Sequence, residues 1–374
     1  MAVVTSFPQD TGSPAGGVEA VSVNLVRTLA RFDDLEVHVI TLDSSIGHNQ
    51  IEPWGRAVVH RLACETKSVL LNAITAGRRL VKGYLAKLKP DVVHSHDTFG
   101  LMVKGLRAPR VFTVHGFIYG DTLVSGVKLP RLRSALWKWI ETRGWADQPH
   151  IISISPYVRE RLSGIVKGTI HDIENPIAES FFKVERQEKQ GVIFSAAVIS
   201  PRKNTLALVD AVNILVKEGV NVRLRMAGKV VEPGYGRAVQ SRIDANGLRE
   251  KVTLLGSIGV EQVQAELAQT SVFALVSLEE NAPLGIEEAM AVGVPVVASN
   301  RCGMPYMVRH GETGFLVNPF APNDIAQRIR QLLSDQNLRR AMGERSRQVA
   351  FDDYHPELVA KRTMKVYSEA IQGY

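Results

Sequence analysis

Two patterns of apolar residues alternate along the first half of the chain: short continuous runs and longer runs with helical spacing. One helical run covers residues 18–31, with Val21, Leu25, Val26 and Leu29 on one face. Such alternation is typical of parallel sheets covered by helices, so it predicts an α/β fold. The runs that predict buried strands are residues 2–7, 37–42, 91–94, 110–114 and 151–154.

A second α/β series follows a highly charged segment, residues 183–190, which we interpret as a linker. Leu208, Ala211, Val212 and Leu215 recur at i, i+3, i+4 and i+7, which predicts an amphipathic helix. The predicted strands are residues 191–197, 222–227, 252–255, 272–276 and 294–298. At 374 residues the chain is long enough for two domains, placed at 1–180 and 181–350, followed by a C-terminal segment, 351–374.

The composition suits a protein with soluble cores. Apolar residues make up 45% of the chain, and no uncharged apolar run reaches eighteen residues, so we expect no transmembrane helix. The two cysteines, Cys64 and Cys302, lie far apart and make no metal pattern, which favours the cytoplasm. The net charge of +7 is local, because residues 67–143 carry fourteen Lys or Arg against four Asp or Glu. A basic face of this kind points to an anionic partner.

The segment SLEENAPLGIEEAMAVGVPVVAS, residues 277–299, carries the strongest chemical signal. Glu280 falls in a turn-like stretch, and Glu288 lies eight positions later in a predicted helix. Carboxylates accept hydrogen bonds from sugar hydroxyls, while the free N–H groups at a helix start attract phosphate. This combination indicates a ligand that bears both groups.

That segment resembles the E-x7-E signature of the retaining glycosyltransferase family of group 1, or family four, which includes bacterial enzymes of polysaccharide and glycolipid synthesis. Other pieces typical of the family occur in the expected order. They are SPAGGVEAVSVNLVRTLA near the start, DVVHSHD (91–97), TVHGF (113–117), Asn175-Pro176, SPRKN (200–204) and HGETGFLVNP (310–319).

The resemblance implies the GT-B fold, in which two Rossmann-like domains with parallel sheets face a central cleft. Domain 1–180 would be the acceptor side, domain 181–350 would bind the nucleotide sugar, and the helix in 351–374 would cross back to the first domain. It implies a hexosyltransferase that moves a sugar from a nucleoside diphosphate to a glycan or lipid-linked acceptor with retention. Such enzymes need no catalytic metal or other cofactor.

The resemblance also assigns donor-binding residues. Lys203 would neutralise the diphosphate, Glu280 would hold the sugar hydroxyls and Glu288 the ribose hydroxyls. The chain departs from the family where a phosphate-binding arginine normally precedes the lysine, since Ala196, Ala197 and Val198 stand there, so Arg202 would take that role. Pro283 has no N–H to donate. The remaining donor contacts in this segment are assigned to Asn281, Leu284 and Gly285.

Two further groups come from the first domain. Gly16 and Gly17 precede a helix, and glycines there permit a close backbone approach or a positive φ. The resemblance implies that this loop closes over the nucleotide. His115 follows a predicted strand and would lie near the reacting sugar, which makes His115, Lys203 and Glu280 the candidate catalytic residues. His94, His96 and Asp97 only superficially resemble a metal site, and Asp97 would line the acceptor side.

A basic segment, residues 128–145, carries three of the four tryptophans. Leu132, Leu136, Trp139 and Ile140 form an apolar stripe among arginines and lysines, which is typical of a helix on an anionic membrane. The alternative is a core helix with a solvated basic face. The first interpretation places a cytoplasmic protein on the inner face of the cell membrane.

Two other functions stay open at the level of sequence. One is a GT-B nucleotide-sugar epimerase. The other is a basic nucleic-acid-binding protein, although no base-reading helix or stacking sheet is recognisable, and we expect no nucleic-acid partner.

Overall fold

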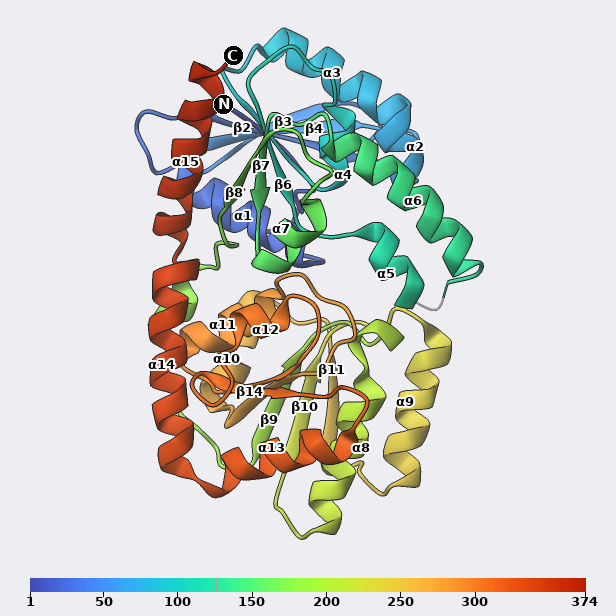
Figure 1. Cartoon of the computed structure of the whole chain (residues 1–374), viewed down its shortest axis with the longest axis vertical. Coiled ribbons are helices and arrows are strands. Elements are labelled where there is room, and N and C mark those ends of the chain that lie inside the picture. Colours follow the sequence, from blue (N-terminus) through green and yellow to red (C-terminus); the bar gives the residue numbers. More distant parts are fainter. Residues whose placement is uncertain (125–126) are drawn as a thin grey trace. The chain divides into compact units, whose positions relative to one another are not determined.

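The structure is a computed structural model that describes residues 1–124 and 127–374 (Figure 1). The chain forms two compact units. Unit 1 comprises Met1–Tyr119, Ala135–Ile177 and His355–Tyr374, and unit 2 comprises Gly120–Ser134 and Ala178–Tyr354. The division passes through helices α5 (Ile118–Val124) and α6 (Pro130–Trp145).

Unit 1 is built on an eight-stranded sheet with the order β3-β4-β2-β1-β5-β6-β7-β8. Its neighbouring strands pair in parallel, except that β3 runs antiparallel to β4. The strands are β1 (Ala2–Val4), β2 (Val37–Asp43), β3 (Gln50–Trp54), β4 (Ala57–Ala63), β5 (Val93–His96), β6 (Arg110–Val114), β7 (His150–Ser153) and β8 (Thr169–Asp172).

Helices cover both faces of this sheet. On one face, the C-terminal helix α15 packs beside α1, and its Val366 and Tyr367 share a core with Val26 and Val39. On the other face, Val81 and Leu85 of α3 cover Val4 and Ile40. The helices are α1 (Gly17–Leu29), α2 (Val69–Ile74), α3 (Ala76–Leu88), α4 (Thr98–Met102), α7 (Pro156–Leu162) and α15 (Pro356–Gln372).

Unit 2 holds a six-stranded, wholly parallel sheet with the order β11-β10-β9-β12-β13-β14. Because β9 pairs with β10 on one side and β12 on the other, the order of strands reverses between β9 and β12. The strands are β9 (Val192–Ala196), β10 (Arg223–Ala227), β11 (Val252–Gly256), β12 (Val272–Leu275), β13 (Val296–Ser299) and β14 (Gly314–Val317).

The helices of unit 2 bury apolar stripes against this sheet. The predicted stripe of Leu208, Ala211, Val212 and Leu215 is fully buried, on α8. The helices are α8 (Thr205–Lys217), α9 (Pro233–Ala245), α10 (Val260–Gln269), α11 (Leu284–Val292), α12 (Met304–Met307), α13 (Pro322–Ser334) and α14 (Gln336–Tyr354), with 3₁₀ turns η1 (Glu179–Lys183) and η2 (Pro201–Lys203). Among the described helices, none combines the length and the apolar character needed to cross a bilayer.

The hydrophobic pattern predicted nearly every buried parallel strand but not β3, β4, β8 and β14. β3 is an edge strand with exposed residues and a proline, so it shows no clear alternation. The charged segment 183–190 is not a free linker. Gln187 and Lys189 donate backbone hydrogen bonds to Ala268 and Gln269, which fixes the segment on unit 2.

Helix α6 matches the predicted basic segment, and its apolar stripe faces outward. Leu132, Leu136 and Trp139 are exposed. Trp145 is instead buried against Phe117. The interpretation as a core helix is therefore wrong for most of the stripe and holds only at the C-terminal end.

Candidate active site

The reversal of strand order in unit 2 marks the point where ligands of open α/β sheets usually bind, beyond the carboxyl ends of the strands. Two sequence-predicted residues meet there. Lys203 ends the turn that follows β9, and Glu280 lies in the loop that follows β12. The topology thus explains why residues 77 positions apart in sequence are neighbours.

Lys203 and Glu280 form a short ion pair through Nζ and Oε1. Their side chains are only 13% and 8% exposed, so the pair is shielded from solvent screening. Burial alone would raise the pKa of Glu280, but Lys203 and Arg202 outweigh it and lower that pKa. Burial lowers the pKa of Lys203, and Glu280 opposes this shift. The site therefore holds a partly desolvated cation, Lys203, beside a carboxylate, Glu280, that stays ionised.

Arg202 adds a second cation. Its Nη1 lies 3.4 Å from Glu280 Oε2 and donates a 2.8 Å hydrogen bond to the Glu279 carbonyl. The same nitrogen lies 3.7 Å from Oδ1 of Asp121. The structure thus brings Arg202 to the place where it could substitute for the family arginine that Ala196, Ala197 and Val198 lack.

Asp121 is a member of this cluster that the sequence did not reveal. It lies on α5 within unit 2, and burial raises its pKa to about 6, with Arg202 opposing and Glu280 reinforcing the shift. No pattern around Asp121 signals this position, because only the three-dimensional path of the chain brings it to Arg202.

Asn204 fixes the loop that presents the two cations. It adopts the left-handed conformation, with φ of 55°, which asparagine tolerates better than most residues. Its Nδ2 donates to the carbonyls of Val276, at 3.1 Å, and Pro319, at 2.7 Å. The turn after β9 is therefore tied to the loops after β12 and β14.

Helix α11 begins at Leu284, next to this cluster in sequence. Pro283 occupies its N-cap without a side-chain hydrogen bond, so the first N–H groups of the helix lack intrahelical partners. A Cβ at Gly285 would lie 3.2 Å from the Ala196 carbonyl, which shows that the start of α11 approaches the end of β9 closely. Asn281, in the preceding loop, is buried.

Glu288 lies one turn inside α11, half-buried. Burial raises its pKa to about 8, so the carboxyl is mainly protonated at neutral pH. The structure places Glu288 on the helix that starts at the cation cluster, and no ion pair joins it to a described residue.

His115 is held inside unit 1. Its Nε2 is 2.8 Å from His96 Nδ1, its side chain also hydrogen-bonds with Asn175, and its backbone N–H donates to Asp97 at 2.9 Å. Burial lowers the pKa of His115 to about 4, so the imidazole is neutral. Its ring is therefore positioned as an uncharged polar group.

The neighbouring His94, His96 and Asp97 serve this packing. His94 hydrogen-bonds with Tyr367 and Thr113, at 2.7 Å each, through its two ring nitrogens. Among the described residues, the side chains close enough to share a metal ion are instead His150, His171 and Glu369, a group that the sequence did not suggest.

The glycine pair lies at the start of α1. Gly16 is the N-cap with φ of −168°, which any residue adopts, and a Cβ there would meet nothing within 4 Å. Gly17 is the first helical residue. Gly16 therefore does not use the positive φ that glycine permits, and the closure of this loop over the nucleotide stays a prediction.

Two family models match the chain and together span most of it. The model for glycosyl transferases group 1 matches residues 176–349, and the model for glycosyltransferase family 4 matches residues 15–181. Both describe glycosyltransferases, which sets aside the epimerase and nucleic-acid interpretations.

Relatives agree with these matches. An uncharacterized glycosyltransferase of Methanocaldococcus jannaschii is 25% identical over 364 residues, with 95% of each chain covered. Sucrose-phosphate synthase of Thermosynechococcus elongatus has a similar fold, with a TM-score of 0.82, 19% identity and full coverage of both chains. HepE of Anabaena, solved with UDP and glucose, gives a TM-score of 0.72 at 18% identity, covering 98% of this chain and 99% of its own.

The fold, the two family models and these relatives lead to one conclusion: the chain belongs to the GT-B glycosyltransferases of group 1 and family 4, and its activity is that of a hexosyltransferase acting on nucleotide sugars.

Proposed function

We propose that the protein transfers a sugar, with retention of anomeric configuration, from a nucleoside diphosphate to a hydroxyl of a glycan or lipid-linked acceptor. The observation that carries this proposal is the Lys203–Glu280 pair, with Arg202 beside it, at the strand reversal of unit 2. A diphosphate needs concentrated positive charge, and a sugar needs hydrogen-bond acceptors. This cluster supplies both.

Each residue then has a chemical role. Lys203 and Arg202 bind the diphosphate, together with the N–H groups of Leu284 and Gly285. When phosphate oxygens bind Lys203, they replace Glu280 as its partner. The carboxylate of Glu280 can then accept hydrogen bonds from the hydroxyls of the donor sugar. Glu288 accepts from the ribose hydroxyls. Asn281 completes the donor site of unit 2. Gly16, Gly17 and His115 of unit 1 stay predicted contributors, and His115 would have to exchange its hydrogen bond to His96 or Asn175 for one to the sugar.

The reaction we propose needs no enzymic nucleophile. The acceptor oxygen bonds to the anomeric carbon on the side from which the diphosphate leaves, the bond from that carbon to the phosphate oxygen breaks, and the acceptor proton passes to the departing phosphate. Lys203 and Arg202 stabilise the charge that develops on the leaving group. The protein therefore acts mainly by positioning and electrostatics.

We also propose that no divalent metal takes part, because Lys203 and Arg202 themselves supply the cationic charge that the leaving diphosphate requires. Activity is expected to be unchanged by EDTA. A loss that added Mg²⁺ or Mn²⁺ restores would contradict this.

The direct test is a panel of nucleoside-diphosphate sugars, with hydrolysis or transfer read by mass spectrometry. UDP-sugars come first, because the HepE structure contains UDP and glucose. One donor should be consumed by the wild type and not by Lys203→Ala. The matched control is Lys217→Ala, an exposed lysine at the end of α8. Equal turnover by Lys203→Ala would contradict the proposed site.

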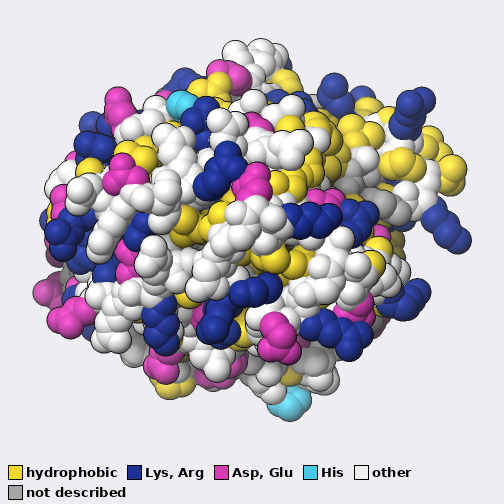
Figure 2. All heavy atoms as spheres, turned by 90° about the horizontal axis from the view of Figure 1, so that it is seen from below, with side chains coloured by type: hydrophobic (Ala, Val, Ile, Leu, Met, Phe, Trp, Pro, Cys, Tyr) yellow, Lys and Arg dark blue, Asp and Glu magenta, His cyan; other side chains and the backbone are white. Residues whose placement is uncertain are grey.

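We propose further that α6 docks the enzyme on an anionic membrane. Leu132, Leu136 and Trp139 are 68%, 48% and 55% exposed, and Arg143 lies 4.1 Å from the Trp139 ring centre. Figure 2 shows hydrophobic side chains gathered with Lys and Arg at one edge of the molecule. Basic residues near an anionic surface contribute roughly 1 kcal/mol each.

Vesicle sedimentation tests this surface. Binding to vesicles with anionic lipid should exceed binding to neutral vesicles, should fall with salt, and should weaken in Trp139→Ala. Replacement of the exposed Phe351 of α14 by Ala is the control for lost apolar area elsewhere. Equal binding to neutral and anionic vesicles would contradict electrostatic docking.

A further inference from the structure

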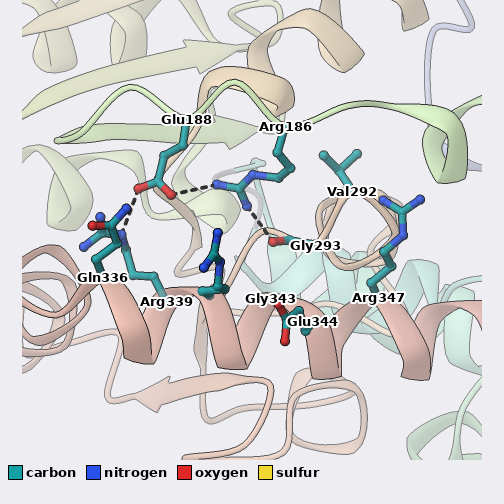
Figure 3. A pocket seen from close by; sticks show the side chains of 10 residues that line it. Arg186, Glu188, Val292, Gly293, Gln336, Arg339, Gly343, Glu344 and Arg347 are labelled. Carbon is teal, nitrogen blue, oxygen red and sulfur yellow. Dashed lines mark hydrogen bonds and ion pairs between the residues drawn. The ribbon is translucent and has the colours of Figure 1, made fainter.

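A pocket of about 350 Å³ opens in unit 2 where three segments meet (Figure 3). Its walls come from the segment before β9, the end of α11, and one face of α14. Arginines dominate the lining: Arg186, Arg339, Arg340 and Arg347 contribute four cations, and Glu188 and Glu344 contribute two carboxylates. None of these residues belongs to the proposed donor site.

Glu188 organises the inner wall. It lies 2.8 Å from Arg339 Nε and 3.3 Å from Arg186 Nη2, as the dashed lines of Figure 3 show. Arg186 also donates to the carbonyls of Gly293, at 2.5 Å, and Thr270, at 2.6 Å. Arg339 donates to the carbonyls of Leu332 and Leu333 through Nη1. These contacts hold two guanidinium groups in fixed positions.

The outer wall of the pocket has guanidinium N–H donors that no described residue accepts. Arg347 donates to the Phe182 carbonyl through one nitrogen, Nη2. Arg340 is exposed, and within residues 1–124 and 127–374 it has no hydrogen bond or ion pair. Glu188 balances part of the charge on Arg186 and Arg339, and Glu344 lies beside Arg340 and Arg347 on α14. Four arginines against two glutamates leave a net charge of +2 in the lining. In a concave site such an excess attracts anions.

The rest of the lining indicates the size and polarity of the ligand. Only Val292 contributes an apolar side chain, and Gly293 and Gly343 contribute none. The two glycines allow α11 and α14 to approach closely, since a Cβ at Gly343 would lie 2.2 Å from the Gly293 carbonyl. The pocket is at the small end of the range for small-molecule sites, which is about 300–1,000 Å³.

From these observations we propose that this pocket binds a phosphate dianion, either free or as a small monoester. Arg340 and Arg347 make the contacts, and the preformed Arg186–Glu188–Arg339 group supports them. Arginine forks match phosphate oxygens in pairs, which is the chemistry that this wall offers. Anchoring the segment before β9 needs only Arg186, Glu188 and Arg339, so it leaves Arg340 unexplained.

Calorimetric titration of the full chain with inorganic phosphate and with glycerol phosphate tests this site. Lys203→Ala is used as the background, so that binding at the proposed donor site does not contribute, and chloride at equal ionic strength controls for screening. In that background, Arg340→Gln should weaken phosphate binding about tenfold or more, the effect of losing charge-assisted hydrogen bonds. Tighter binding of the monoester would identify the esterified form, and tighter binding of phosphate the free ion.

Arg345→Gln is the matched control. Arg345 is on the same helix and is also exposed, but it donates to the Glu312 carbonyl and does not line the pocket. The proposal predicts unchanged binding in this variant. It is overturned if neither anion binds, or if Arg340→Gln and Arg345→Gln have equal effects, because the arginines would then serve only to anchor the chain.

Discussion

The two units differ in the polar groups that they bury: unit 1 has pairs of histidines, and unit 2 has a cluster of charged side chains. In unit 1, histidines on or next to neighbouring strands pair with one another: His38 with His60 at 2.9 Å, His96 with His115 at 2.8 Å, and His150 with His171 at 3.1 Å. In unit 2, the cluster at the strand reversal is made of charged groups, Lys203, Arg202 and Glu280.

This difference determines how each unit responds to protons. A neutral imidazole offers one donor and one acceptor, so a pair of rings needs at least one uncharged member, and protonation of both would break their hydrogen bond. An ion pair requires the reverse, since both members must be charged. Unit 1 therefore provides uncharged polar groups, and unit 2 provides the charge that a diphosphate needs.

The largest expected difference between the two units is in their stability at acid pH. Burial lowers the pKa of His94 to about 3 and of His115 to about 4, and it also lowers that of His60, His96 and His171. Unfolded histidines bind protons below about pH 6.5, whereas His94 and His115 stay neutral in the folded state down to about pH 4, so the free energy of unfolding should fall between pH 6.5 and 4. Each of these two groups contributes up to about 1.4 kcal/mol per pH unit.

Carboxyls with raised pKa act in the other direction. Asp97 in unit 1 has a pKa of about 6, and Asp121 and Glu288 in unit 2 have values of about 6 and 8. Below these pKa values the three carboxyls are protonated in the folded state, so their contribution to the free energy of unfolding grows as pH falls. Hydrogen exchange at pH 7 and pH 5 should show β5 and β6 losing protection before β9 and β12. Earlier loss in unit 2 would contradict this.

Removing one charge from the Lys203–Arg202–Glu280 cluster of unit 2 should give the next largest effect, a loss of activity. Glu280→Gln keeps the shape of the side chain but leaves Lys203 without its counter-charge and the donor sugar without a carboxylate. We expect kcat/KM to fall about a hundredfold, as when one preorganised group is lost. Glu250→Gln is the control, because Glu250 is an exposed glutamate of the same unit that lies outside the cluster. Equal losses in both variants would contradict the assignment.

The substitution Glu288→Gln should change donor affinity and the free energy of unfolding in opposite directions. Because burial raises the folded pKa of Glu288 to about 8, its contribution to stability is lost as pH rises through 8. The variant should therefore be more stable than wild type at pH 9, by about 1 kcal/mol, while its donor affinity falls about tenfold. Urea unfolding and calorimetry measure the two effects. Unchanged donor affinity would refute the proposed ribose contact.

An effect on stability alone, with no change in donor binding, should come from the hydrogen bond between α15 and the sheet of unit 1. Tyr367→Phe removes the hydroxyl that lies 2.7 Å from His94 Nδ1, in a buried setting. The free energy of unfolding should fall by about 1–2 kcal/mol. Tyr374→Phe, at a 71% exposed position on the same segment, should change it little. A similar loss in both would show that the buried hydrogen bond is not the cause.

The sequence was informative where the structure is local or strongly patterned. Continuous apolar runs predict β6, β9, β10 and β12, and the E-x7-E segment predicts Glu280 as a site residue. Lys203 was identified from a resemblance, and the structure adds the physical reason for its position, which is the reversal of strand order between β9 and β12.

Features that depend on long-range packing were beyond the sequence. Asp121 reaches Arg202 only through the path of the chain. The segment 183–190 resembled a linker because its Arg186 binds two carbonyls, of Gly293 and Thr270, that no local pattern reveals. The glycine pair permitted a positive φ at Gly16, and the structure has extended backbone there instead.

The central claim is that the donor diphosphate binds at Lys203 and Arg202 in unit 2. A crystal structure with the nucleoside-diphosphate sugar identified by the donor panel tests it most directly. We predict phosphate oxygens in hydrogen-bond contact with Lys203 Nζ, at about 2.7–3.2 Å, and Glu280 turned to the sugar. A diphosphate bound elsewhere, with the Lys203–Glu280 pair undisturbed, would contradict the account.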